Sequence, residues 1–550
     1  MLAKLRLLAC AIVAGWLLTI GPAAAQPQSD AEKMERLERQ VDLLQKQLKA
    51  VQDEIKATKK KKSEKAQAKA VPAVDAATPK PNTLPPISFE TKTSYEPRSL
   101  ETKRFPSLAG VRVTLGGYVA AESVFRARNE VADMGDIFNA IPYPFSPLYS
   151  EHEFHASARG SRLSLLAEGD TGTAHRFAAY FESDFLGVGE TSNYTESNSW
   201  SPRLRQAYLT YDDTDRGYHI LAGQAWSLLT PTKVGITPRQ ENDPLTIDYN
   251  QVVGFDFTRN WQVRFVKDFD KTLWFGVSVE NPATLTASGN IPGSVNGILV
   301  NFSNVGGGGG FLTGVDVTTD QAPDIIVKAA LDPGWGHYEV FGIQRFFTDS
   351  TFCSSVVPTG CVLNTIDRKT SYGTGVGGAV LLPVIPRYVD VQGSIMYGTG
   401  IGRYGSGQLP DVTIAADGAL APITALHVFG GVVVHPREGL DVYAYGGMEQ
   451  ARVRFFDQLG YGNPVFDNSG CTITTASSFN TTTTSTCVAN NRRLSEITVG
   501  FWQDLYKGHL GRFTLGAQYE YIRREAFEGI GGAPSTDNNV FYTSLRYYPF

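Results

Sequence analysis

Apolar and polar side chains alternate along many short segments of this 550-residue chain from Val111 onward. In the segment 512–521, for example, Phe513 and Tyr519 share one face of an extended backbone, and Glu520 lies on the other. Sixteen segments of this kind can be counted up to the end of the chain. Strands with one apolar and one polar face must hide the apolar face from water, so the pattern predicts an all-β fold.

The lengths of the connections separate a barrel from a soluble sandwich, whose strands also alternate. The long connections span residues 127–154, 186–202, 231–257, 281–322, 347–367, 398–420 and 455–492, and one of intermediate length spans residues 525–538. Short connections lie near residues 169–172, 213–216, 270, 332–336, 383–389, 435–439 and 505–509. Tight turns at one rim and long loops at the other are typical of outer-membrane barrels, which have lipid outside and a polar lumen. We therefore predict a 16-stranded antiparallel transmembrane β-barrel over residues 111–550.

The two ends of the chain predict export to that membrane. Two basic residues precede an apolar core, Leu7–Ile20, and three consecutive alanines follow it, so residues 1–25 are predicted to be a signal peptide. The apolar core has 14 residues, fewer than a membrane-spanning helix needs, and a retained anchor is the alternative. The segment 539–550 is a strand that ends on the aromatic Phe550, as outer-membrane barrels do. The predicted location is the outer membrane of a Gram-negative bacterium.

Residues 30–58 are predicted to form a coiled-coil helix. Apolar residues recur there at alternating spacings of three and four, and the core positions are Met34, Leu37, Val41, Leu44, Leu48, Val51 and Ile55. Burial of this seam against copies of itself would stabilise the helix, and an isolated amphipathic helix on a surface is the alternative. Residues 59–110 begin with four lysines and are predicted to be a disordered or extended linker. Beneath an outer-membrane barrel both segments would lie in the periplasm, where the lysines could contact peptidoglycan.

Charge and cysteine content limit the kinds of partner and cofactor that the chain could bind. The net charge of −5 does not suggest a nucleic-acid binder. In an exported chain Cys353, Cys361, Cys471 and Cys487 are expected to form disulfides. Three connectivities are open, and the local one, 353–361 with 471–487, is favoured because each pair closes one loop. A metal site is the rival, but no histidine accompanies the cysteines at ligand spacing, so we predict no metal and no cofactor. No set of nucleophile and base is recognisable, so we predict that the chain is not an enzyme.

Several short motifs, in this order, resemble trimeric outer-membrane porins, above all the DcaP-like group and next the phosphate-selective porins. The matching stretches are Gly116–Val119, Ala158–Leu163, Tyr180–Phe185, Arg203–Tyr208 and Leu221–Ser227. The coiled coil ahead of the barrel is similar to that group as well. The resemblance implies a homotrimer in outer-membrane lipid, a periplasmic helical extension, and passive diffusion of small hydrophilic, often anionic, dicarboxylate-like solutes.

The resemblance also implies that the loop after the fifth strand folds into the barrel. In this chain that loop is 231–257, and we expect its Lys233 and Arg239 to help form a constriction. On the wall, alternation directs Arg162 and Arg264 into the lumen. Guanidinium groups suit carboxylate or phosphate because they bind bidentately.

Alternation does not decide whether Arg203 and Arg205 point into the lumen, because the apolar residues Ala207 and Leu209 follow on the same face of the strand. The neighbouring Arg159 has the opposite parity to Arg162, so that both point inward only if a bulge lies at Gly160.

These residues predict a weak preference for anions, which replacement of Arg162 or Arg264 by alanine would reduce. The alternative is that each arginine is neutralised by a lumen acid such as Glu168, Glu182, Asp184 or Glu520 and only stiffens the wall. A structural role in tethering the cell wall is the alternative to a porin function.

Overall fold

The computed structural model describes residues 102–104, 110–170, 174–187, 200–287, 294–295, 298–301, 320–353, 363–474 and 487–549, together with Lys49. The chain divides into two compact units, 1–88 and 89–550, and every described strand belongs to the second. The predicted signal peptide, the coiled-coil core and most of the predicted linker lie outside the described residues, as does Phe550.

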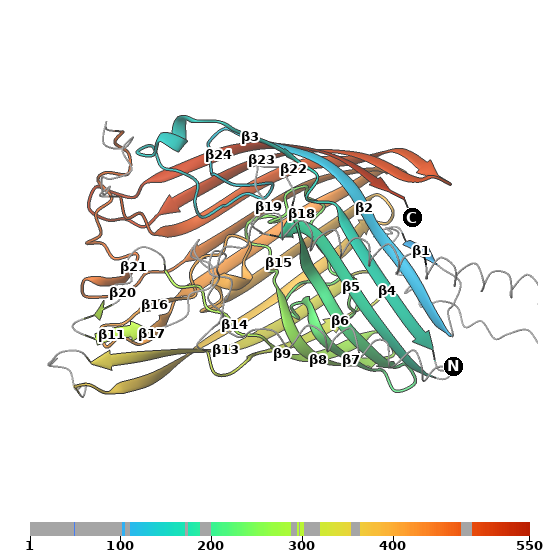
Figure 1. Ribbon diagram of the computed structural model, residues 1–550, viewed down its shortest axis with the longest axis horizontal. Helices are drawn as coiled ribbons and strands as arrows, with labels where there is room; N and C mark the ends of the chain where they lie inside the picture. Colours follow the sequence, from blue (N-terminus) through green and yellow to red (C-terminus); the bar gives the residue numbers. More distant parts are fainter. Residues whose placement is uncertain are drawn as a thin grey trace, which may run out of the picture. The chain divides into compact units, whose positions relative to one another are not determined.

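Within the described residues, sixteen long strands form one antiparallel sheet (Figure 1). They are β2 (Val111–Arg126), β3 (Glu153–Ser157) with β4 (Arg162–Asp170) as one interrupted strand, β5 (His175–Gly187), β6 (Ser201–Asp213), β7 (Tyr218–Trp226), β8 (Arg259–Phe269), β9 (Leu273–Glu280), β12 (Asp324–Leu331), β13 (His337–Cys353), β14 (Ile366–Ile385), β15 (Val389–Thr399), β18 (Thr424–Arg437), β19 (Leu440–Ala451), β22 (Asn491–Gly508), β23 (Gly511–Ala526) and β24 (Ser535–Tyr548). The last strand pairs with the first, from Val119 opposite Tyr547 to Arg126 opposite Val540. The sheet is therefore a closed barrel without free edges, and the predicted strand number is confirmed.

Shorter elements decorate this barrel. They are β1 (Thr102–Arg104), β10 (Ser294–Val295), β11 (Ile298–Asn301), β16 (Val412–Ile414), β17 (Leu420–Pro422), β20 (Arg454–Phe456), β21 (Leu459–Tyr461), and the 3-10 turns η1 (Pro147–Ser150) and η2 (Gly402–Tyr404). β1 lies within the segment predicted as linker and pairs with β2 at Thr114–Gly116. β1 consists of threonine, lysine and arginine, so it has no alternation of apolar and polar side chains that would predict a strand.

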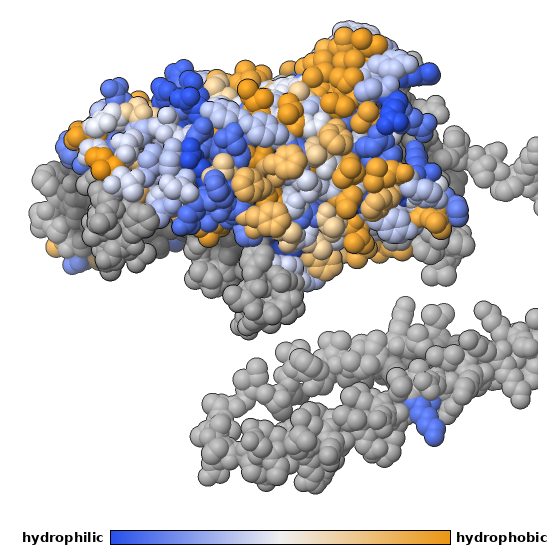
Figure 2. Space-filling model, turned by 90° about the horizontal axis from the view of Figure 1, so that it is seen from above, coloured by the Kyte–Doolittle hydropathy of each residue, from blue (hydrophilic) through white to orange (hydrophobic). Residues whose placement is uncertain are grey.

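The outward side chains are apolar and the inward ones polar. In β8, Trp261, Val263 and Phe265 are 58%, 38% and 43% exposed, whereas the side chains of Gln262 and Arg264 are buried. On the face drawn in Figure 2, apolar side chains gather in a broad band with polar ones toward the ends. Within the described part of the chain, no helix has the length and apolar character to cross a membrane.

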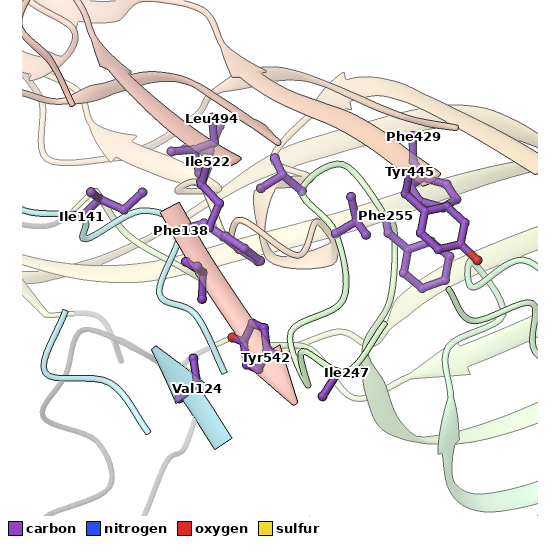
Figure 3. Packing of buried hydrophobic residues seen from close by; sticks show 14 of the residues in the cluster. Val124, Phe138, Ile141, Ile247, Phe255, Phe429, Tyr445, Leu494, Ile522 and Tyr542 are labelled. Carbon is purple, nitrogen blue, oxygen red and sulfur yellow. The ribbon is translucent and has the colours of Figure 1, made fainter. Parts of the chain in front are cut away.

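The interior of the barrel is packed. The connection between β7 and β8 runs inside it, and its Ile247 and Phe255 belong to one cluster of buried apolar side chains with wall residues such as Phe429 and Tyr542 (Figure 3). Phe138, from the connection between β2 and β3, joins the same cluster. Tight turns join the strands at one rim, and long connections join them at the other (Figure 1).

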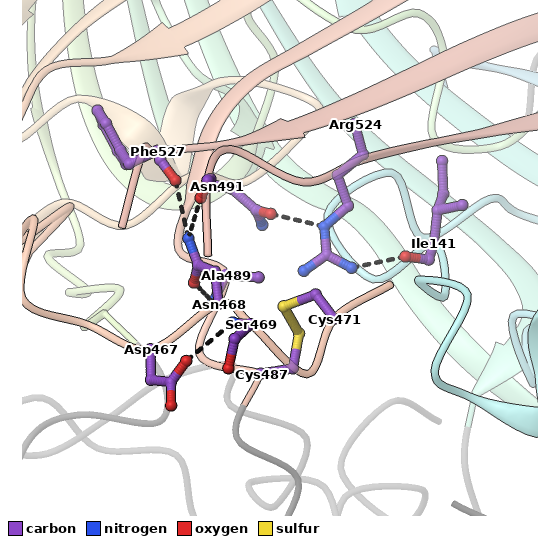
Figure 4. The surroundings of a disulfide bond; sticks show 11 residues. Ile141, Asp467, Asn468, Ser469, Cys471, Cys487, Ala489, Asn491, Arg524 and Phe527 are labelled. Atoms are coloured by element: carbon purple, nitrogen blue, oxygen red, sulfur yellow. Dashed lines mark hydrogen bonds between the residues drawn. A yellow bond between two sulfur atoms is a disulfide. The ribbon is translucent and has the colours of Figure 1, made fainter. Parts of the chain in front are cut away.

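Two of the four cysteines form a predicted pair. Cys471 and Cys487 are joined by a disulfide, with an S–S distance of 2.06 Å, in the long connection between β19 and β22 (Figure 4). Nearby, Arg524 of β23 donates a hydrogen bond to the carbonyl of Ile141 at 2.6 Å, which ties this region to the β2–β3 connection. Cys353 ends β13 and is disulfide-bonded, and Cys361 lies outside the described residues.

Candidate pore lining inside the barrel

The segment between β7 and β8, residues 227–258, is held inside the barrel by its backbone. Its amide groups at Leu228, Thr232, Val253 and Gly254 donate hydrogen bonds of 2.8, 3.0, 2.8 and 3.0 Å to four wall carboxylates. These acceptors are Glu280 of β9, Glu339 of β13, Glu496 of β22 and Glu449 of β19. Because the four strands lie around the wall, residues 227–258, the inward segment, cross the interior as the resemblance implied.

The two basic residues expected in this segment have different neighbours. Arg239 donates from Nη1 to the hydroxyl of Tyr208 at 3.2 Å, and its guanidinium carbon is 5.7 Å from the ring centroid of Tyr180. Burial lowers the pKa of the Lys233 ammonium, although Asp243 and Glu241 oppose this effect. Burial, with Asp243 nearby, raises the pKa of Glu241 to about 7.

On the wall, two arginines share two acids of β5. Arg205 forms ion pairs with Glu182 and, at 3.0 Å, with Asp184. Arg203 pairs with Asp184 at 2.7 Å, and Arg162 lies 3.8 Å from Glu182. Asp243 of the inward segment lies within electrostatic range of Arg205 and Arg162, which brings the segment next to this part of the wall.

A bulge settles the direction of Arg203 and Arg205, which alternation had left open. Glu182 is opposite Gln206, but Ser183 is opposite Leu204, so Arg205 is one extra residue in β6. The extra residue reverses the parity of the strand. Arg203 and Arg205 therefore face the acids inside, while Leu209 further along is 64% exposed outside.

The segment between the predicted connections 127–154 and 169–172, which the sequence predicts as a single strand, 155–168, is broken in the structure. β3 ends at Ser157 and β4 begins at Arg162, and Arg159 and Arg162 both turn inward across the gap. A Cβ at Gly160 would overlap the hydroxyl of Tyr249 in the inward segment, which donates to Glu122 of β2. The close approach of these two chain segments requires glycine at this position.

Arg264 also lies inside the barrel, but it binds backbone. Its Nη2 donates to the carbonyl of Trp226 at 2.6 Å, and its Nε donates to Gln262 at 3.0 Å. Its acidic neighbours are Glu280 and Glu241, which differ from the acids that hold Arg203 and Arg205. This hydrogen bond to Trp226 fixes the backbone at the end of β7, where the inward segment begins.

The sequence did not single out Arg259, the first residue of β8. Its guanidinium carbon is 5.1 Å from the ring centroid of Trp226, and it lies within electrostatic range of Arg203, Arg205 and their acids. Its Nη1 is buried, and no hydrogen-bond partner for it exists among the described residues. Arg259 precedes Trp261 by two residues, and the side chain of Trp261 points outward. Alternation alone therefore predicts that Arg259 points outward as well.

We call Arg162, Arg203, Arg205 and Arg259 the arginine cluster. Its four positive charges stand against two paired carboxylates, Glu182 and Asp184, and the nearby Asp243 is offset by Lys233 of the inward segment, which leaves a local excess of +2. In a barrel interior with low-dielectric walls, such an excess acts on ions over several ångströms. The arrangement can therefore attract an anion.

Comparison with solved structures identifies the fold. No protein-family model matches the chain, and no curated protein matches its sequence. The outer membrane channel DcaP of Acinetobacter baumannii has a TM-score of 0.53 at 18% sequence identity, over 80% of this chain and 99% of its own. The anion-selective porin from Comamonas acidovorans has a TM-score of 0.41 at 10% identity, over 80% of this chain and 99% of its own. OmpF of Salmonella typhi has a TM-score of 0.42 at 8% identity, over 81% of this chain and all of its own. The sixteen-stranded barrel of this chain thus has the fold of the outer membrane channel DcaP.

Proposed function

We propose that the protein is a porin of the outer membrane, a channel rather than an enzyme, for passive diffusion of small hydrophilic anions. The observation that carries this proposal is the arginine cluster with its excess charge of +2, beside a segment that crosses the barrel. The barrel fold shared with DcaP supports the location in a membrane.

The chemistry of the cluster favours solutes with carboxylate groups. A guanidinium group donates two parallel hydrogen bonds to one carboxylate, so the arginine cluster suits such solutes. A dicarboxylate could contact two arginines at once, since Arg203 and Arg205 come from the same strand and Arg259 faces them. Phosphate is the second anion that this donor set fits.

Planar-bilayer recording and liposome swelling test the proposal. We expect the purified full chain to open ion-conducting channels whose reversal potential in a KCl gradient shows a weak preference for chloride. Swelling should be faster with dicarboxylates than with neutral sugars of similar size. Protein that opens no channel would refute the porin function, and a preference for potassium would refute the selectivity.

We also propose that the protein is a homotrimer whose coiled coil, residues 30–58, lies in the periplasm on the side of the tight turns. The heptad spacing and the resemblance to trimeric porins support this assembly. Deletion of residues 30–58 should leave the barrel folded but lower the temperature at which trimers dissociate on a semi-native gel. Equal dissociation temperatures would contradict a role of the helix in assembly.

A further inference from the structure

Three carboxylates from distant parts of the sequence meet inside the barrel. Asp136 belongs to the β2–β3 connection, Asp248 to the inward segment and Glu520 to β23. One oxygen atom of each lies within 4.8 Å of the others. The three residues are 1%, 2% and 0% exposed, so water does not screen their charges.

Protein donors satisfy only one oxygen atom of each carboxylate. Asp136 Oδ1 accepts from Arg126 and, at 3.0 Å, from the hydroxyl of Tyr542. Asp248 Oδ1 accepts from the backbone amides of Asn250 at 2.8 Å and Asp136 at 3.4 Å. Gln518 donates to Glu520 Oε1.

The second oxygen atoms of the three carboxylates are buried. Asp136 Oδ2, Asp248 Oδ2 and Glu520 Oε2 have no hydrogen-bond partner in the part of the chain that the structure describes. A buried carboxylate oxygen without a partner is costly, and here three occur together. They therefore form a cluster of acceptors that faces no protein donor.

Positive charge at the cluster is insufficient. Among the described residues its one ion-pair partner is Arg126, which also pairs with Glu153 at 3.1 Å. The guanidinium of Arg126 thus pairs with two carboxylates, and Asp248 and Glu520 have no ion-pair partner among the described residues.

We infer that Asp136, Asp248 and Glu520 bind one divalent cation of the calcium type, which fastens the inward segment to the barrel wall. Calcium takes oxygen ligands at about 2.3–2.6 Å, so two ligands of one ion can lie as far apart as these atoms do. Its coordination is flexible and accepts an all-protein site, whereas magnesium keeps several waters. No sequence pattern indicated this metal site, because these three acids are far apart along the chain.

Bound calcium would join three elements that the backbone does not connect locally. Asp248 lies between the amides of Ile247 and Val253, which already bind Gln518 of β23 and Glu496 of β22. The ion would therefore strengthen an existing attachment, and its removal should lower the stability of the barrel. This inference holds whatever solute the channel passes, and the tests below do not measure permeation.

Terbium luminescence on the detergent-solubilised full chain tests the site, after treatment with EDTA and removal of the chelate. The ring of Tyr542 is adjacent and can sensitise Tb³⁺, so we expect saturable emission at one ion per barrel that Ca²⁺ displaces. Asp248→Asn and Glu520→Gln should each weaken binding at least about tenfold, because each removes one charged ligand. Glu241→Gln, a neutralised acid of the same segment outside the cluster, should bind as the wild type does.

Thermal unfolding supplies a second readout that does not depend on Tb³⁺. EDTA should lower the unfolding temperature of the wild type and of Glu241→Gln, but not that of Asp248→Asn. The inference is overturned if the wild type shows no saturable emission, or if emission persists in both cluster variants. It is also overturned if EDTA leaves wild-type unfolding unchanged, since the carboxyl groups would then share protons instead of a metal ion.

Discussion

Arg259→Gln tests whether the excess charge of the arginine cluster sets ion selectivity. The substitution removes a charge that no described acid pairs within 4.0 Å, so it breaks no ion pair and lowers the excess from +2 to +1. By contrast, removal of Arg205 would leave Glu182 and Asp184 with fewer partners. Arg259 is therefore the cleaner position for measuring the effect of one charge.

The size of the effect follows from Coulomb's law. In water, a monovalent anion that passes at about 5 Å from the guanidinium gains about 0.8 kcal/mol. Screening over half a Debye length at about 0.1 M salt reduces this energy to about 0.5 kcal/mol. Loss of the charge then lowers the local anion concentration about 2.3-fold and raises that of cations equally, so the permeability ratio should fall by up to about fivefold.

Reversal potentials in a KCl gradient measure that ratio. Arg216→Gln is the matched control, because it removes the same charge from a turn where the side chain is 75% exposed and screened by solvent. We expect the control to keep the wild-type ratio. If Arg259→Gln changes selectivity no more than Arg216→Gln does, the cluster does not determine which ions pass.

Three further outcomes are expected. Because Glu241 has a pKa of about 7, its carboxyl group is neutral near about pH 5.5 and charged near about pH 8.5. The anion preference of the wild type should therefore rise as the pH falls. In bilayer recordings, Glu241→Gln should remove this pH dependence. Cys471→Ser removes a disulfide between residues 16 positions apart, which should lower the free energy of unfolding by about 3 kcal/mol in denaturant titrations. A free energy of unfolding equal to that of the oxidised wild type would show that other contacts hold the loop. Gly160→Ala should displace Tyr249 and alter the single-channel conductance. Gly169→Ala is the control, because its added methyl group meets no atom within 4 Å, and it should leave the conductance unchanged. Equal conductances of the two variants would refute the close packing at Gly160.

The sequence predicted the barrel well because alternation is a local property. The predicted strand Val111–Arg126 has the bounds of β2, and the tight turns fall where glycine, aspartate and proline end the alternating segments. The inward course of residues 231–257 could be expected only from the resemblance to porins. No pattern in the sequence of this segment predicts that Glu339 and Glu496 accept hydrogen bonds from its backbone amides.

Alternation failed where the backbone loses or gains a residue. The break at Gly160 and the extra residue at Arg205 each reverse the parity of a strand, and both depend on what lies on the neighbouring segment. Arg259 stands at a strand end, where the direction of a side chain is set by the incoming loop. Contacts between residues more than 100 positions apart, such as Asp136 with Asp248, leave no periodic signal at all.

The attachment of the inward segment has a consequence for electrical recordings. Four of its amides are bound to side chains of four different strands, and Tyr249 is bound to a fifth. A chain held at so many separate points cannot swing about one hinge, because every displacement breaks several hydrogen bonds at once. Closure of the whole channel should therefore be rare and slow, because it requires local unfolding of the segment.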